Sequence, residues 1–274
     1  RTLLAKIYAE KPLRDYAKVI HYCDEVKADG FDLVEDFNDL FGMNAAGTYA
    51  KIRNTKESIL EAQFTPGAGN WCSWMFGRDL VNWNTNFTWA KWVTPSRDLI
   101  NAFKKEGDEV RFKESVVYYD CNWSNYYPSD NYPFMYKCRS ANSSIIKYRY
   151  ADVLLLKAEA LIMQDTPDLD GAADIIDEVR ERAKLGALSA STRSNKNAML
   201  NALLKERRLE LAFEGQRWFD LVRLDKVEEV MNAVYSKDSG RKAQVYAFDK
   251  TSYRLPIPQS VIDANDKIHQ NPGY

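Results

Sequence analysis

KYRYADVLLLKAEALIMQD, residues 147–165, has the clearest helical pattern in the chain. Its apolar side chains recur at intervals of three and four residues, which places them along one face of an α-helix. That face would carry Tyr150, Val153, Leu154, Ala158 and Leu161. The stretch therefore predicts a helix that packs against its neighbours through this face.

Three further stretches downstream repeat the helical pattern. They are residues 170–183, which follow a capping Asp168 or Asp170, residues 197–213, and residues 216–234. Together with the first stretch they predict four helices arranged as two hairpins. A polar tail follows from residue 236, and its prolines predict that YRLPIPQ (253–259) is neither a helix interior nor a central strand. We expect this tail to be mostly extended and to wrap the helical body.

Upstream, residues 1–30 predict another pair of antiparallel helices, with Pro12 where the second can start and Gly30 where it can end. Helix pairs of this kind stack into tetratricopeptide-like solenoids. Residues 31–140 are rich in loops, with one helix that begins at Pro95 or Ser96 and ends at Gly107.

These patterns predict a mainly α fold, a tetratricopeptide-like helical-repeat scaffold with long aromatic-rich loops and a few short strands. We divide the chain into a helical hairpin with connecting loops (1–66) and an aromatic-rich loop region for ligand binding (67–140). The C-terminal helical hairpins (141–236) and an extended tail (237–274) complete the division.

Composition excludes several classes of function. The chain has 38 Lys and Arg against 39 Asp and Glu, so it presents no basic field for nucleic acid. Its longest purely aliphatic run, 153–156, is far shorter than a membrane-spanning helix. No spacing of Cys and His suggests zinc, and we expect no cofactor; calcium is possible, although no EF-hand-like spacing supports it. The four cysteines, Cys23, Cys72, Cys121 and Cys138, can be free thiols or form two disulfides.

The densest charge pattern is KERRLELAFEGQRWFDLVRL, residues 205–224. Glu214, Arg217, Asp220 and Arg223 alternate in sign at three-residue spacing, and Arg207 lies three residues before Glu210, so both sets can form ion pairs. A general acid among these glutamates is conceivable. So many guanidinium groups should keep the carboxylates ionised, which favours a structural network over catalysis.

At these residues the chain resembles a known family. The stretches 148–161, 175–188, 203–224 and 253–274 are similar, in this order, to the C-terminal half of SusD/RagB proteins, and 31–42, 57–64 and 94–112 are also similar. The family's amino-terminal part, with its lipid-bearing cysteine, has no counterpart here, so we expect a fragment of a longer protein.

The resemblance implies a non-catalytic surface lipoprotein of Bacteroidetes that binds glycans. Such a protein would deliver nutrient to a SusC-like TonB-dependent transporter in the outer membrane. Its membrane attachment would be an N-terminal lipid anchor absent from this chain. The family's ligand contacts lie in variable loops, so the candidate site residues must be chosen on physical grounds.

Five of the seven tryptophans lie within NWCSWMFGRDLVNWNTNFTWAKW, residues 70–92, and neither helix nor strand periodicity explains their spacing. Flat rings interleaved with hydrogen-bonding side chains suit a sugar, whose C–H face stacks on a ring while its hydroxyls bond to polar groups. YYDCNWSNYYPSDNYPFMY, residues 118–136, has the same composition. The ligand-binding candidates are Trp74, Arg78, Trp83, Asn84, Trp89, Trp123, Tyr126 and Tyr127, whereas we expect Trp71 and Trp92 to be anchors and Trp218 to lie in the core.

Two alternatives remain open. A peptide- or protein-binding helical-repeat module would use the concave surface of the solenoid instead of the loops. A glycoside hydrolase would also use aromatic platforms, together with paired carboxylates whose separation the sequence does not reveal.

Overall fold

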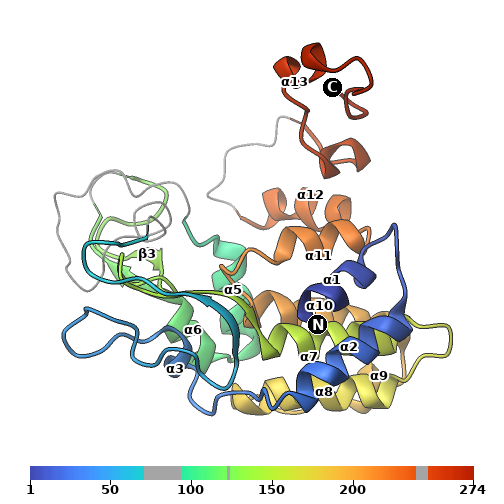
Figure 1. The fold of residues 1–274 in the computed structure, drawn as a ribbon. Coiled ribbons are helices and arrows are strands. Elements are labelled where there is room, and N and C mark those ends of the chain that lie inside the picture. The colour runs from blue at the N-terminus through green and yellow to red at the C-terminus, as the bar shows by residue number, and fades with distance from the viewer. Residues whose placement is uncertain (71–93, 122–123, 239–245) are drawn as a thin grey trace. The chain divides into compact units, whose positions relative to one another are not determined.

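The computed structural model describes residues 1–70, 94–121, 124–238 and 246–274 (Figure 1). These residues divide into two compact units, Arg1–Arg217 and Trp218–Tyr274. The trace is mainly helical, and no helix in the described part is both long enough and apolar enough to cross a bilayer.

The scaffold of the first unit consists of paired helices. Their bounds are α1 (Thr2–Ala9), α2 (Tyr16–Ala28), α7 (Tyr150–Met163), α8 (Leu169–Arg182), the short α9 (Ala190–Arg193) and α10 (Lys196–Glu210). Helix α7 is central, since it packs against α1, α2, α8 and α10. Almost every one of its side chains is buried, which confirms the helix predicted from its apolar pattern. The tetratricopeptide-like helical scaffold is likewise confirmed.

Local capping chemistry fixes most helix ends. Ser96 accepts a hydrogen bond from the Leu99 amide at the start of α5 (Arg97–Glu106), and Gly107 ends that helix with a left-handed φ of 71°. Asp168 caps α8 in the same way. Helix α2 begins at Tyr16, later than Pro12, because the side chain of Asp15 caps it there.

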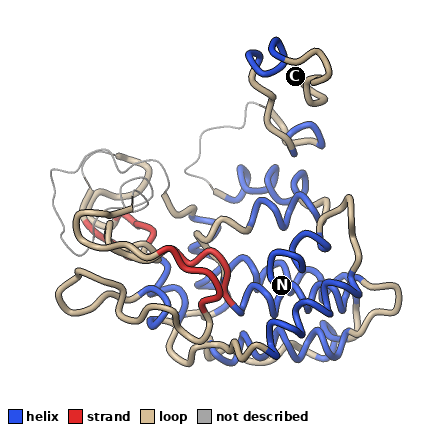
Figure 2. The backbone as a smooth tube through the Cα atoms, viewed as in Figure 1, coloured by secondary structure: helices blue, strands red, loops and turns tan. Residues whose placement is uncertain are grey.

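Two short antiparallel sheets lie to one side of the helices α1, α2 and α7–α10 of the first unit (Figure 2). Strand β1 (Ser58–Ala62) pairs with β4 (Ile145–Arg149), which runs directly into α7. Strand β2 (Val116–Tyr119) pairs with β3 (Tyr132–Met135). Strand β2 follows α6 (Glu109–Ser115) directly, and the one-turn helix α3 (Asn38–Phe41) precedes β1 in the chain. The β2–β3 hairpin therefore carries the second aromatic-rich stretch.

The single helix predicted over 216–234 is wrong. The chain forms α11 (Arg217–Arg223) and α12 (Val227–Lys237), with Asp225 between them at a left-handed φ of 55°. A left-handed residue cannot continue a right-handed helix, so the helix must break there. Trp218 is half-buried instead of lying in the core, and its ring centroid is 6.3 Å from that of Phe248.

The tail of the second unit is mostly irregular, with a 3₁₀ turn η1 (Lys250–Tyr253) and the short helix α13 (Gln259–Ala264). Residues 254–258 form neither helix nor strand, as their prolines predict. Wrapping of the tail around the helical body stays a prediction.

A buried charge network lies where the helices meet the sheets. The guanidinium of Arg149, 1% exposed, donates to Glu57 at 2.6 Å and to Glu210 at 2.5 Å. It also donates to both carboxylate oxygens of Glu214, at 2.7 and 2.8 Å. Arg182 also forms ion pairs with both Glu57 and Glu210, so these two carboxylates share two arginines. The end of β4 is thereby joined to the residue that precedes β1 and to α8 and α10.

Arg111 completes the network on the other side of Glu210. It donates to Glu210 at 2.9 Å, to Glu206 at 2.5 Å and to Asp108 at 2.6 Å, and it is fully buried. The predicted ion pairs form both along and between helices. Asp220 and Arg223 pair at 2.8 Å along α11, and Arg207 of α10 pairs with Asp152 of α7.

The pKa shifts in the network fit a structural role. Burial disfavours the charge of Glu210, but Arg182, Arg149 and Arg111 outweigh it and hold the pKa of Glu210 well below its ordinary value. Glu206 differs, since burial raises its pKa despite Arg111. Both glutamates are fully buried, so neither reaches a substrate as a general acid.

Candidate functional site

The loop between β2 and β3 presents the candidate site. Its two sides are joined by the Cys121 amide, which donates to the Ser129 carbonyl at 2.6 Å, and a turn forms where the Asn131 amide donates to the Pro128 carbonyl at 3.2 Å. Within the loop, the Tyr126 amide donates to the Ser124 hydroxyl at 3.3 Å. These bonds hold the consecutive residues Tyr126 and Tyr127 in a compact arrangement.

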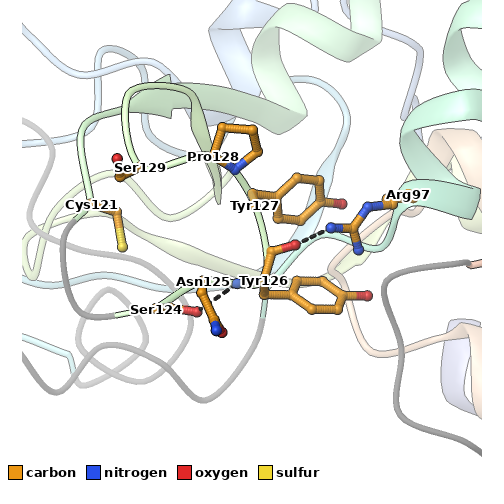
Figure 3. A pocket seen from close by; sticks show the side chains of 8 residues that line it. All are labelled: Arg97, Cys121, Ser124, Asn125, Tyr126, Tyr127, Pro128 and Ser129. Atoms are coloured by element: carbon orange, nitrogen blue, oxygen red, sulfur yellow. Dashed lines mark hydrogen bonds between the residues drawn. The ribbon is translucent and has the colours of Figure 1, made fainter.

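Arg97, the first residue of α5, contacts both tyrosines (Figure 3). Its guanidinium carbon lies 4.3 Å from the ring centroid of Tyr126 and 4.2 Å from that of Tyr127, within the range of cation–π attraction. The same guanidinium donates a hydrogen bond to the Tyr126 carbonyl. The two rings are nearly perpendicular, at 88°, with centroids 5.0 Å apart. One cation thus fixes two aromatic side chains of different orientation.

Hydrogen bonds also fasten this loop to the segment before α5. The Tyr127 hydroxyl donates to the Pro95 carbonyl at 2.8 Å. The Tyr132 hydroxyl lies 3.1 Å from the Thr94 hydroxyl and donates to Ser124 at 3.1 Å. Tyr132 is buried, 4% exposed, and packs at 5.6 Å against the ring of Tyr127, so it supports the site from beneath.

The surface here is an open hollow of about 780 Å³. It is lined by Arg97, Cys121, Ser124, Asn125, Tyr126, Tyr127, Pro128 and Ser129 (Figure 3). Its volume is within the range of small-molecule sites, and it combines aromatic rings with hydroxyl and amide groups. Such a lining can stack against the C–H face of a sugar and hydrogen-bond to its hydroxyls.

The structure brings together two of the sequence-predicted site residues, Tyr126 and Tyr127, which are half-buried and line this hollow. The other candidates, Trp74, Arg78, Trp83, Asn84, Trp89 and Trp123, lie outside the described residues, as do the expected anchors Trp71 and Trp92, and they stay predictions. Sequence reasoning missed Arg97, Ser124, Asn125 and Ser129. Their polar side chains were a signal, but the proximity of Arg97 depends on tertiary structure.

Neither the cysteines nor the acidic side chains add a reactive or metal-binding group among the described residues. Cys23 and Cys121 are buried free thiols, so the alternative of two disulfides is wrong. Burial raises the pKa of the Cys23 thiol to about 12, which makes it unreactive at neutral pH. Within the described ranges, no group of three or more His, Cys, Asp or Glu side chains is placed to hold a metal ion.

Comparison with known proteins identifies the family. The sequence model of the SusD family matches residues 129–274, which is more than half of the chain. The chain belongs to the SusD family. A SusD-like protein of Formosa agariphila, P2, is 33% identical over 142 residues, covering 50% of this chain and 27% of that protein. A second, P38, is 40% identical over 99 residues, or 34% of this chain and 19% of that protein.

Several solved structures have the same fold, and one of them is a SusD superfamily protein. A Parabacteroides distasonis member matches with a TM-score of 0.74 and 24% identity, covering 99% of this chain and 62% of that one. Surface glycan-binding protein A of Bacteroides thetaiotaomicron, solved in complex with laminarihexaose, matches with a TM-score of 0.73 and 21% identity, over 98% and 62% of the two chains. This chain therefore spans less than two thirds of these relatives.

Proposed function

We propose that this chain is part of a non-catalytic protein that binds glycans at the bacterial surface. The ligand would lie in the hollow over Tyr126 and Tyr127. The observation that carries the proposal is the pair of half-buried tyrosine rings held around Arg97 beside Ser124 and Asn125. Membership of the SusD family, and a structural neighbour solved with laminarihexaose, support it.

Each part of the hollow has a function in this proposal. Rings fixed by a cation lose little conformational entropy when a sugar stacks on them. The hydroxyls of Ser124 and Ser129 and the amide of Asn125 are both donors and acceptors, which suits sugar hydroxyls. The candidates Trp74, Trp83, Trp89 and Trp123, with Arg78 and Asn84, would extend the platform.

The proposal predicts that a glucan retards the purified protein in affinity gel electrophoresis. Tyr126→Ala and Tyr127→Ala should each weaken binding by about 1–3 kcal/mol, by analogy with the loss of base stacking on aromatic side chains. A panel of polysaccharides first identifies the best ligand. Titration calorimetry then measures the affinity for that glycan and for laminarihexaose.

Tyr49→Ala is the matched control. Tyr49 likewise lies under an arginine, with the guanidinium carbon of Arg53 4.9 Å from its ring centroid, but it is exposed and does not line the hollow. Equal losses in Tyr49→Ala and Tyr126→Ala would contradict the site. Release of reducing sugar would favour a glycoside hydrolase, and binding of peptides but no glycan would favour a helical-repeat module.

We extend the proposal to location and partner. The whole protein would be a lipoprotein of the outer membrane that delivers its glycan to a SusC-like TonB-dependent transporter. Family membership supports this part. Co-purification of the full-length protein with such a transporter from outer membranes tests it, and recovery in another cell fraction would contradict it.

A further inference from the structure

A second, smaller hollow lies in the first unit beside the charge network. It measures about 250 Å³ and is lined by residues of α3, the end of β3, the start of β4 and the loop after α10. Two aromatic side chains, Phe41 and Phe213, and the thioether of Met135 form much of its apolar wall. None of its lining residues belongs to the hollow over Tyr126 and Tyr127.

The polar part of this hollow contains unused hydrogen-bonding capacity. The buried Lys137 ammonium donates to the Glu210 carbonyl at 2.8 Å and to Glu214 at 2.6 Å, two of the three bonds it can make, and it lies 4.8 Å from the ring centroid of Phe41. The Ser144 hydroxyl, also in the lining, is shielded from solvent and has no hydrogen-bond partner among the described residues. An unmade bond at a shielded hydroxyl costs free energy, which a ligand could recover.

The charge of the site favours a neutral ligand. In the described structure, the ion pairs connected to Glu214 contain as many acidic as basic side chains. The basic members are Arg111, Lys137, Arg149, Arg180, Arg182 and Lys205, and the acidic members are Glu57, Glu106, Asp108, Glu206, Glu210 and Glu214. Lys147 adds a charge at the rim, but it is exposed, so water and salt screen it.

We propose that this hollow binds a single neutral sugar ring, with its C–H face against Phe41 and Phe213 and its hydroxyls bonded to Lys137, Ser144 and Glu214. The volume is below the usual range for drug-sized ligands, which suits one ring and not a chain. Burial lowers the pKa of Lys137 to about 8, so the ammonium remains a donor at neutral pH. The site does not depend on the proposed function of the Tyr126–Tyr127 hollow.

The probe for this site is methyl β-glucopyranoside, and the readout is the NMR signal of ¹³C-labelled methionine methyl groups. The Met135 methyl, assigned with Met135→Leu, should shift with a Kd on the order of 1 mM, whereas the methyl of the fully buried Met199 should not. Ser144→Leu fills the hollow and should weaken binding at least about tenfold, a loss of about 1.4 kcal/mol.

Two control variants separate the sites. Ser191→Leu changes an exposed serine elsewhere, and Tyr126→Ala alters the larger hollow; both should keep the Met135 shift. No shift in the wild type, an equal shift in Ser144→Leu, loss of the shift in Tyr126→Ala, or tighter binding of glucuronate would overturn this inference. None of these results bears on laminarihexaose binding at Tyr126 and Tyr127, which is measured separately.

Discussion

Arg149 and Arg97 show two uses of the same side chain in one chain. Arg149 is buried among the carboxylates of Glu57, Glu210 and Glu214, where it joins strand β4 to distant elements. Arg97 lies between two tyrosine rings that line an open hollow. The first arrangement holds the scaffold together, and the second orients side chains that face a ligand. The comparison implies that stability and ligand affinity respond to different residues.

The largest expected effect is at the centre of the network. Glu210→Ala removes the carboxylate shared by Arg111, Arg149 and Arg182 and leaves three buried cations with fewer partners. We expect a loss of about 3–5 kcal/mol in the free energy of unfolding, measured with urea. Arg217→Ala, which removes a bond of 2.9 Å to the Leu204 carbonyl, should cost less, about 1.5–3 kcal/mol.

Both variants should keep the wild-type affinity for the glycan that the polysaccharide panel identifies, in the fraction that remains folded. A weaker affinity in folded Glu210→Ala would break the separation between network and hollow. Tyr126→Ala is the reciprocal control, because it should lower the affinity and yet cost less free energy of unfolding than Glu210→Ala, although it removes a half-buried ring that contacts Arg97 and Tyr127.

The network was predictable in kind but not in its partners. The stretch 205–224 indicated structural ion pairs from its alternating charges, yet Arg149 meets Glu57, which is 92 positions away in the sequence. Helix periodicity and caps such as Ser96 and Asp168 are local, so the sequence predicts them well. The contact of Arg97 with Tyr126, 29 positions apart, depends on how the β2–β3 loop packs against α5, which no local pattern encodes.

Acid should affect the two regions differently. The folded chain holds the pKa of Glu210, and also that of Glu214, below the ordinary value of 4.5; burial acts against this, and the arginines prevail. At a pH between the pKa in the folded chain and the ordinary pKa, the unfolded chain binds more protons than the folded chain. The stabilisation is therefore complete above about pH 4.5 and is lost as the pH falls through the pKa of the folded chain. Each unit by which the folded chain lowers the pKa of a glutamate adds about 1.4 kcal/mol to the free energy of unfolding.

Urea titrations from about pH 7 to about pH 3 measure this dependence. Asp108 and Glu206, whose pKa values burial raises, act in the opposite direction and moderate the total. Glu210→Gln should flatten the acid slope, whereas Tyr126→Ala should leave it unchanged. An unchanged slope in Glu210→Gln would mean that this carboxyl group does not carry the acid sensitivity.

The smallest expected effect is at the hydroxyl of Tyr127. Tyr127→Phe removes the hydrogen bond of 2.8 Å to the carbonyl of the buried Pro95 and keeps the ring beside Arg97. The free energy of unfolding should fall by about 0.5–1.5 kcal/mol, the usual net value of one such bond. Affinity for the glycan that the polysaccharide panel identifies should persist, because stacking uses the ring face. If Tyr127→Phe lost as much affinity as Tyr127→Ala, the hydroxyl itself would contact the sugar, and the hollow would bind through hydrogen bonds more than through stacking.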